Sequence, residues 1–182
     1  TEILRLHQVT SGFYKTDDGQ IKSLKNPKIT ELCNIIDETE GKIIIWANYL
    51  HNIHDILETL KKKFPEDRAV SIYGAVSVPD RDKAVVDFQT DKYTRFMVGN
   101  PATGGLGLNL TAATTVIYFS NSYDLTLREQ SEDRAHRKGQ TKSVTYIDLI
   151  MQGTIDEFII RALNKKKSMS AQVLGEEVLK FL

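Results

Sequence analysis

Two patterns of apolar and polar residues alternate along most of the chain. The first is a short run of apolar residues, which is typical of a strand buried on both faces of a parallel sheet. The second places apolar residues three and four positions apart, as an amphipathic helix requires. The apolar runs lie at residues 42–47, 69–73, 96–99, 115–119 and 144–149. Alternating strands and helices predict an α/β fold, a parallel sheet with helices on both faces.

Capping residues mark where four of the expected helices begin. Asn26, Ser77, Asp124 and Thr154 each precede such a segment, and their side chains can accept hydrogen bonds from the first free backbone amides. Pro residues follow Asn26 and Ser77 at early helical positions, where proline is tolerated. The helix after Asp124 is expected to end at Lys138 and Gly139, a cation and a glycine suited to a helix end.

The regular pattern divides the chain into three parts. Residues 1–25 have scattered apolar positions and an Asp17-Asp18-Gly19 turn, which indicate an N-terminal arm or hairpin. Residues 26–167 carry the repeated strands and helices of the main domain. Residues 168–182 form a last amphipathic segment after three lysines, and we expect a C-terminal amphipathic helix there.

Composition narrows the classes of partner. The chain has 182 residues with 41% apolar content and equal numbers of basic and acidic residues, 24 of each. Because the net charge is zero, a polyanion would have to be met by local clusters rather than by the whole surface. Cys33 is the only cysteine, and no apolar run is long enough to cross a bilayer. We therefore expect an intracellular, reduced protein with no membrane partner.

The segment from Asn121 to Gln140 is the least core-like of the expected helices. Its inward stripe carries Gln130, Arg134 and Arg137 in place of apolar residues. Two arginines so close on one face repel each other unless anions lie opposite, and forked guanidiniums suit phosphate oxygens. One interpretation is therefore a phosphate clamp. The other is a solvated helix whose arginines pair with the acidic residues of the same segment, Glu129, Glu132 and Asp133.

A glycine-rich loop from Gly99 to Leu110 follows the third apolar run. Ligands of open parallel sheets bind at the carboxyl ends of the strands, so this loop and the one after Phe119 are candidate sites. The loop is not a phosphate loop, because Gly105-Leu106 stands where Lys and Ser or Thr are required. A purely structural corner remains the alternative.

A metal site is not expected. The acidic pair Asp37-Glu38 follows helical rather than strand spacing, so we interpret it as a solvated helix end. His51 and His54 are three residues apart but have no third ligand in view.

Several of these segments together resemble motifs of Swi/Snf-type superfamily-two helicases. The loop Thr103–Leu110 looks like motif V, the helix Gln130–Gln140 like motif VI, and the strand Ile43–Trp46 like motif IV. The resemblance runs in order from about residue 26 to 167. It also covers Tyr73-Gly74 with Arg81 and Phe88, and Gly153–Glu157 near the end of the domain.

The resemblance implies a three-layer RecA-like lobe, the second of the two lobes of a DNA-dependent ATPase. The N-terminal RecA-like lobe of the same protein would hold most of the ATP and Mg²⁺, which accounts for the missing phosphate loop. The resemblance assigns Arg137 as the catalytic arginine finger, Arg134 as its catalytic partner and Gln130 as a nucleotide-positioning residue. The isolated chain is expected to be inactive as an ATPase.

The same resemblance distributes the loop between nucleotide and double-stranded DNA. Gly105, Gly107 and Asn109 are expected on the nucleotide side, and Asn100, Thr103 and Gly104 on the DNA side. Where the family commonly has small hydroxyl residues before the glycines, this chain has Asn100 and Pro101, so the hydroxyl contact is expected at Thr103. Tyr123-Asp124-Leu125 replaces the Trp-Asn-Pro run often found before motif VI, so the contacts of that run are not transferred.

The leading hypothesis is a motor lobe of an ATP-dependent DNA helicase or translocase. A non-catalytic DNA- or protein-binding module with the same fold and an RNA helicase lobe remain alternatives. The lack of long insertions favours a compact bacterial or phage protein in the cytoplasm, and a eukaryotic protein of this kind would be nuclear.

Overall fold

The computed structural model describes residues 2–103 and 107–181. Its centre is a five-stranded sheet in the order β4-β5-β3-β6-β7, and every neighbouring pair is parallel. The strands are β3 (Lys42–Trp46), β4 (Arg68–Ile72), β5 (Thr94–Gly99), β6 (Ala113–Tyr118) and β7 (Thr145–Asp148). The five apolar runs of the sequence therefore all form strands, and the predicted α/β fold is confirmed.

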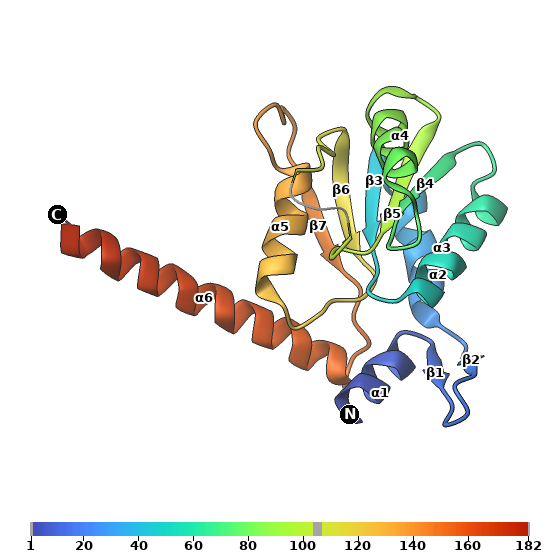
Figure 1. The fold of residues 1–182 in the computed structure, drawn as a ribbon, viewed down its shortest axis with the longest axis horizontal. Helices are drawn as coiled ribbons and strands as arrows, with labels where there is room; N and C mark the ends of the chain where they lie inside the picture. The colour runs from blue at the N-terminus through green and yellow to red at the C-terminus, as the bar shows by residue number, and fades with distance from the viewer. Residues whose placement is uncertain (1, 104–106, 182) are drawn as a thin grey trace.

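Helices cover both faces of this sheet (Figure 1). They are α2 (Pro27–Asp37), α3 (Leu50–Lys63), α4 (Val78–Thr90), α5 (Leu125–Ala135) and α6 (Ile155–Phe181). Asn26, Ser77 and Asp124 cap α2, α4 and α5 with their side chains, as predicted. Because all five strands run parallel, their carboxyl ends meet at one edge of the sheet.

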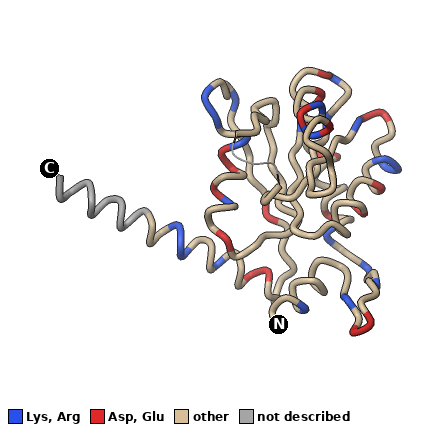
Figure 2. Tube along the Cα trace, in the orientation of Figure 1, with Lys and Arg blue, Asp and Glu red and all other residues tan. Residues whose placement is uncertain are grey.

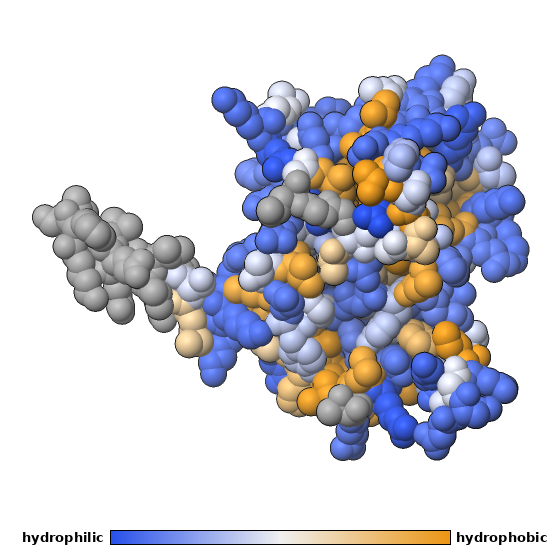
Figure 3. Space-filling model, in the orientation of Figure 1, coloured by the Kyte–Doolittle hydropathy of each residue, from blue (hydrophilic) through white to orange (hydrophobic). Residues whose placement is uncertain are grey.

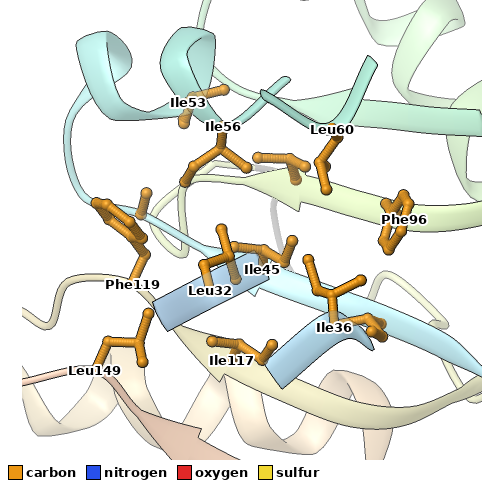
Figure 4. Close-up of a cluster of buried hydrophobic side chains, with 13 residues drawn as sticks. Leu32, Ile36, Ile45, Ile53, Ile56, Leu60, Phe96, Ile117, Phe119 and Leu149 are labelled. Atoms are coloured by element: carbon orange, nitrogen blue, oxygen red, sulfur yellow. The ribbon is translucent and has the colours of Figure 1, made fainter. Parts of the chain in front are cut away.

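Strand β3 shows why the core has two halves. Its successive side chains point to opposite faces, so Ile43 and Ile45 pack under α2 and α3, whereas Ile44 and Trp46 pack toward α4 and α5. Figure 4 shows the first half, in which Leu32 from α2 and Ile56 from α3 meet the sheet. All of these side chains are at most 1% exposed.

The N-terminal segment contains a helix, α1 (Glu2–Thr10), and a hairpin of β1 (Phe13–Lys15) with β2 (Ile21–Ser23). The helix was not indicated by the sequence pattern. Its outer side leaves Ile3, Leu4, Leu6 and Val9 about half exposed, and Figure 3 shows apolar surface at that end of the molecule. The boundary of this segment at residue 25 stays a prediction.

A buried ion pair connects the helices that meet at this end of the molecule. Nζ of Lys28 on α2 lies 2.5 Å from Oδ2 of Asp156 on α6, and the two side chains are 3% and 4% exposed. The hydroxyl of Thr10 on α1 donates to the other carboxylate oxygen at 2.9 Å. Asp156 therefore links three helices.

Helix α6 runs without interruption from Ile155 to Phe181 and extends away from the sheet (Figure 1). The sequence analysis treated residues 168–182 as a separate helix after the three lysines, whereas in the structure the helix at these residues continues α6. Lysines favour helix ends but are also good helix formers, so they do not stop a helix by themselves. No helix among the described residues is long and apolar enough to span a bilayer.

Candidate nucleotide and nucleic-acid site

The glycine-rich loop after β5 and the end of α5 form one site. Nη2 of Arg134 donates to the carbonyl of Pro101 at 3.0 Å, and Nη1 of Arg137 donates to the carbonyl of Gly107 at 2.8 Å. Segments about thirty residues apart are thus joined near the carboxyl ends of β3 and β5, on the sheet face that carries α4 and α5. The sequence placed the candidate site in this region.

Arg134 is buried, with 6% of its surface exposed. Its guanidinium lies 5.2 Å from the ring centre of Trp46, the last residue of β3. Burial lowers the pKa of Arg134, and the positive charge of nearby Arg137 lowers it further. Arg134 therefore does not face an open cleft, because loop carbonyls and the indole ring cover its guanidinium.

Arg137 is exposed and lies beyond the end of its helix. Helix α5 ends at Ala135, earlier than the predicted end at Lys138 and Gly139. The side-chain amide of Gln140 donates to the carbonyl of Ala135 at 3.1 Å and also to two carbonyls before and within β6, so tertiary contacts turn the chain away early. Gly139, at φ +108°, serves the following turn instead.

The prediction that Gln130, Arg134 and Arg137 share one face of the helix was therefore wrong, because Arg137 lies beyond the end of α5 and Arg134 is buried. Gln130 is exposed on α5, and no hydrogen bond among the described residues joins it to the loop. The alternative of arginines paired within their own segment is also not observed for Arg134 and Arg137. The carboxylate of Glu132 is used instead by Arg128, at 2.6 Å, and by Lys167 of α6.

Asn100 has a structural position in the loop. Its side-chain amide donates to the carbonyl of Asn48, after β3, at 2.8 Å, and its oxygen accepts from the amide of Ala102 at the same distance. Both ends of the amide are thus used to hold the turn between two strand ends. The predicted DNA contact of this side chain stays a prediction.

The structure describes some of the remaining predicted loop residues and not others. The hydroxyl and amide of Thr111 donate to the exposed Asn109 side chain, and Gly107 adopts φ +123° on the surface. The backbone carbonyl of Thr103 lies 3.5 Å from Nη1 of Arg134. Gly104 and Gly105 lie outside the described residues.

Gly99, at the end of β5, is required by close packing. A Cβ atom at this position would lie 2.5 Å from the carbonyl oxygen of Ile72 and 3.1 Å from the Trp46 ring. Sequence reasoning did not assign Trp46 to the site. Its place at the carboxyl end of the central strand was the signal that could have found it.

The charges of the site fit an anion. Arg134 and Arg137 have backbone carbonyls as their hydrogen-bond partners, and no carboxylate pairs with either among the described residues. The turn that follows α5 adds Lys138 and Lys142 to Arg137 (Figure 2). Guanidiniums without a carboxylate favour phosphate oxygens. Cationic N–H donors suit phosphate oxygens and cannot ligate Mg²⁺. No group of three metal-ligating side chains is found among the described residues.

The parallel sheet, its two helix layers and the position of the site define a RecA-like α/β lobe. Residues 27–139 match the helicase conserved C-terminal domain, and the chain belongs to this family. It is the C-terminal lobe of a Snf2-type superfamily-two helicase.

Similar proteins from other organisms also belong to this group of ATPases and helicases. The chain is 44% identical over 155 residues to the chromatin-remodeling ATPase INO80 of Mycosarcoma maydis, covering 85% of the chain and 8% of the relative. The Drosophila melanogaster INO80 is 39% identical over 160 residues, covering 88% of the chain and 9% of the relative. An uncharacterized ATP-dependent helicase of Mycoplasma genitalium is 30% identical over 179 residues, covering 97% of the chain and 17% of the relative. The chain thus spans a small part of each, and these organisms do not single out a bacterial or phage source.

Solved structures share the fold. The C-terminal part of the Fun30 ATPase domain superposes with a TM-score of 0.69 at 30% identity, covering 76% of this chain and 46% of that one. The Sulfolobus solfataricus SWI2/SNF2 ATPase core in complex with dsDNA gives a TM-score of 0.64 at 30% identity, covering 79% and 30%.

Proposed function

We propose that this chain is the second motor lobe of an ATP-dependent DNA translocase or helicase. In this proposal the end of α5 approaches a triphosphate held mainly, with Mg²⁺, by an N-terminal RecA-like lobe of the same protein. The observation that carries the proposal is the exposed Arg137 guanidinium, held at the glycine-rich loop with no carboxylate partner among the described residues.

Arg137 is the residue best placed to act as an arginine finger. Its Nη1 atom is used by the carbonyls of Gly107 and Leu108, at 2.8 and 3.3 Å, and no other nitrogen of its guanidinium has a hydrogen bond among the described residues. A forked donor can therefore keep its loop contact while offering other N–H groups to phosphate oxygens. ATP supplies the phosphoryl group that is transferred. Arg137 stabilises the negative charge that grows on this group.

Arg134 acts in this proposal as the partner of Arg137. Its buried guanidinium holds the turn at Pro101 and Thr103, and this turn leads into the loop that Arg137 touches. Gln130 on the outer side of α5 would meet the nucleotide only when the other lobe closes. The proposed role of Gln130 therefore depends more strongly on the approach of the other lobe than the proposed role of Arg137.

Duplex DNA is the proposed track. The structural neighbour with dsDNA supports this choice. The loop from Asn100 to Asn109 joins the strand ends to the arginines, so it is suited to link DNA contacts with the nucleotide. Thr103 and Gly104 are the proposed phosphate contacts. A chromatin-remodelling role, as in the names of the INO80 relatives, would place the protein in a eukaryotic nucleus, and a bacterial protein would act in the cytoplasm.

The test is the ATPase activity of the full-length protein with and without double-stranded DNA. Arg137→Ala is expected to lower kcat by about 10³-fold or more while KM for ATP changes much less, because the contact forms mainly in the transition state. Arg161→Ala is the matched control, since Arg161 is an exposed arginine on α6 whose partner is Glu157. It should leave kcat unchanged.

Three outcomes would count against the proposal. Near-normal turnover of Arg137→Ala would remove the finger role. Stimulation by RNA rather than DNA would favour an RNA helicase lobe. No hydrolysis by the full-length protein, together with tight DNA binding by the isolated chain, would favour a non-catalytic binding module.

A further inference from the structure

Helix α5 is held on the sheet mainly by polar contacts. Among its eleven residues the buried ones are Ser131, Arg134 and Ala135, so apolar packing contributes little. The hydroxyls of Tyr118 and Ser131 share a hydrogen bond of 2.6 Å, and the Tyr146 hydroxyl donates to the carbonyl of Glu132 at 3.1 Å. Polar contacts are directional, so they set the direction of a helix more narrowly than apolar contacts do.

The most extensive network of these polar contacts is centred on Arg128, in the first half of α5. Its guanidinium donates to both oxygens of Asp148 on β7, at 2.5 and 3.3 Å, and to the side-chain oxygen of Asn121 at 2.8 Å. Nε donates to Glu132 at 2.6 Å, and the guanidinium carbon lies 3.5 Å from the ring centre of Tyr118 on β6. We call these five residues the Arg128 node.

The node is an ion-pair network with little access to solvent. The Arg128 side chain is 12% exposed, and the side chains of Asp148 and Glu132 are 28% and 22% exposed. Burial by itself would lower the pKa of Arg128, but the hydrogen bond and charge of Asp148, with those of its other neighbours, raise it. Nζ of Lys167 on α6 lies 3.4 Å from Glu132. The node therefore ties α5 to β6, β7 and α6.

We propose that Arg128 is a positioning residue for the arginines at the end of α5. This inference rests on the proposed function of Arg137 and names a residue that acts through it. Arg134 follows Arg128 by six positions, which is roughly 9 Å along a helix. A tilt of about 10° at the node would move the backbone of Arg134 by about 1.6 Å. Misplacement of a catalytic group by about 1 Å can cost about 10²-fold in rate.

Lysine cannot replace arginine at the node. Arg128 uses three nitrogens in a planar fork and stacks on Tyr118, whereas an ammonium group is a compact charge with no face to stack. Arg128→Lys therefore keeps the charge but loses the direction of the contacts. Asp148→Asn is a second variant that keeps the shape of the acceptor and removes its charge.

Trp46 provides a measurement that does not depend on catalysis. It is the only tryptophan of the chain, it is fully buried, and the Arg134 guanidinium lies 5.2 Å from the centre of its ring. If α5 tilts, Arg134 leaves the ring and the indole becomes easier to reach. Quenching of Trp46 fluorescence by acrylamide in the 182-residue chain therefore reports the position of the end of α5.

The experiment compares Arg128→Lys, Asp148→Asn and the control Arg95→Lys. Arg95 is also a partly buried arginine, paired with Asp67 at 2.8 Å, but it holds the chain around Gly41 instead of α5. In the full-length protein we expect both node variants to lower kcat by about 10- to 100-fold with KM for ATP within about threefold. In the 182-residue chain the same variants should raise the acrylamide quenching constant about twofold or more, and Arg95→Lys should change neither quantity.

Two results would overturn the inference. The first is unchanged quenching in both node variants, whatever the activity of the full-length protein. The second is an equal loss of kcat in Arg95→Lys, since this would mean general destabilisation. If the unmodified full-length protein hydrolyses no ATP, the proposed function fails, and the quenching result alone then decides whether Arg128 positions the end of α5.

Discussion

The buried pair of Lys28 and Asp156 gives a sharp test of how this lobe is stabilised. Lys28→Met removes the ammonium group but keeps most of the apolar stem. The Asp156 carboxylate would then keep the Thr10 hydroxyl and the Met151 amide as donors, at 2.9 and 3.0 Å, but no positive charge. Loss of one partner of a buried ion pair costs about 3–5 kcal/mol, because the other charge stays buried without compensation.

A second Lys–carboxylate ion pair with the same N–O distance provides a matched control. Nζ of Lys62 lies 2.5 Å from Glu58, the same distance as in the buried pair, but these side chains are 70% and 65% exposed. Water and salt screen such an exposed pair, and holding two long side chains together costs entropy. We therefore expect Lys62→Met to have no measurable effect on stability.

The assay is urea unfolding of the 182-residue chain followed by Trp46 fluorescence. Lys28→Met should lower the free energy of unfolding by about 3–5 kcal/mol. For a chain of this size this corresponds to a decrease in Tm of roughly 6–20 °C. Equal losses in Lys28→Met and Lys62→Met would refute the reasoning, because the two pairs differ in burial and not in length.

Two further predictions concern pH and packing. Burial lowers the pKa of His7, so stability should be complete above pH about 6.5 and should fall below it by up to about 1.4 kcal/mol per pH unit, because the unfolded chain binds a proton that the folded chain does not. Urea unfolding between pH 7.5 and 5.5 measures this slope. His7→Gln should reduce the slope, whereas the control His136→Gln, at an exposed histidine, should not. An unchanged slope in His7→Gln would contradict the assignment of the pH dependence to His7. Gly99→Ala should cost about 1–3 kcal/mol, because its Cβ meets a carbonyl oxygen at 2.5 Å. Gly74→Ala, where a Cβ meets nothing within 4 Å, should be nearly neutral, and equal unfolding midpoints of the two variants would contradict the packing argument.

The strands and the starts of the helices were predictable because both are local features. The run Ile43-Ile44-Ile45 could only be satisfied by burial on both faces, and the side chains of Asn26, Ser77 and Asp124 cap the amides nearest to them. Short-range hydrogen bonds and apolar periodicity determine these features. The general position of the site followed from the parallel order of the strands.

The end of α5 was not predictable from local signals. The side-chain amide of Gln140 donates to the carbonyls of Thr111, Ala113 and Ala135, and only the tertiary fold brings the first two of these carbonyls to it. The burial of Arg134 has a similar cause, because its carbonyl partners lie more than thirty residues earlier in the chain. An interpretation based on the periodicity of apolar residues places arginine on the surface, and it cannot predict distant carbonyls that accept hydrogen bonds from a buried guanidinium.

The central place of β3 has a consequence for synthesis on the ribosome. Its neighbours β5 and β6 are completed at Gly99 and Tyr118, long after Trp46. At about 5–20 residues per second, the interval from Trp46 to Tyr118 is roughly 4–14 s. During this time the nascent chain exposes an apolar, β-branched segment of the kind that aggregates. We therefore expect this strand, rather than any surface of the finished lobe, to be the principal chaperone-binding segment of the growing chain.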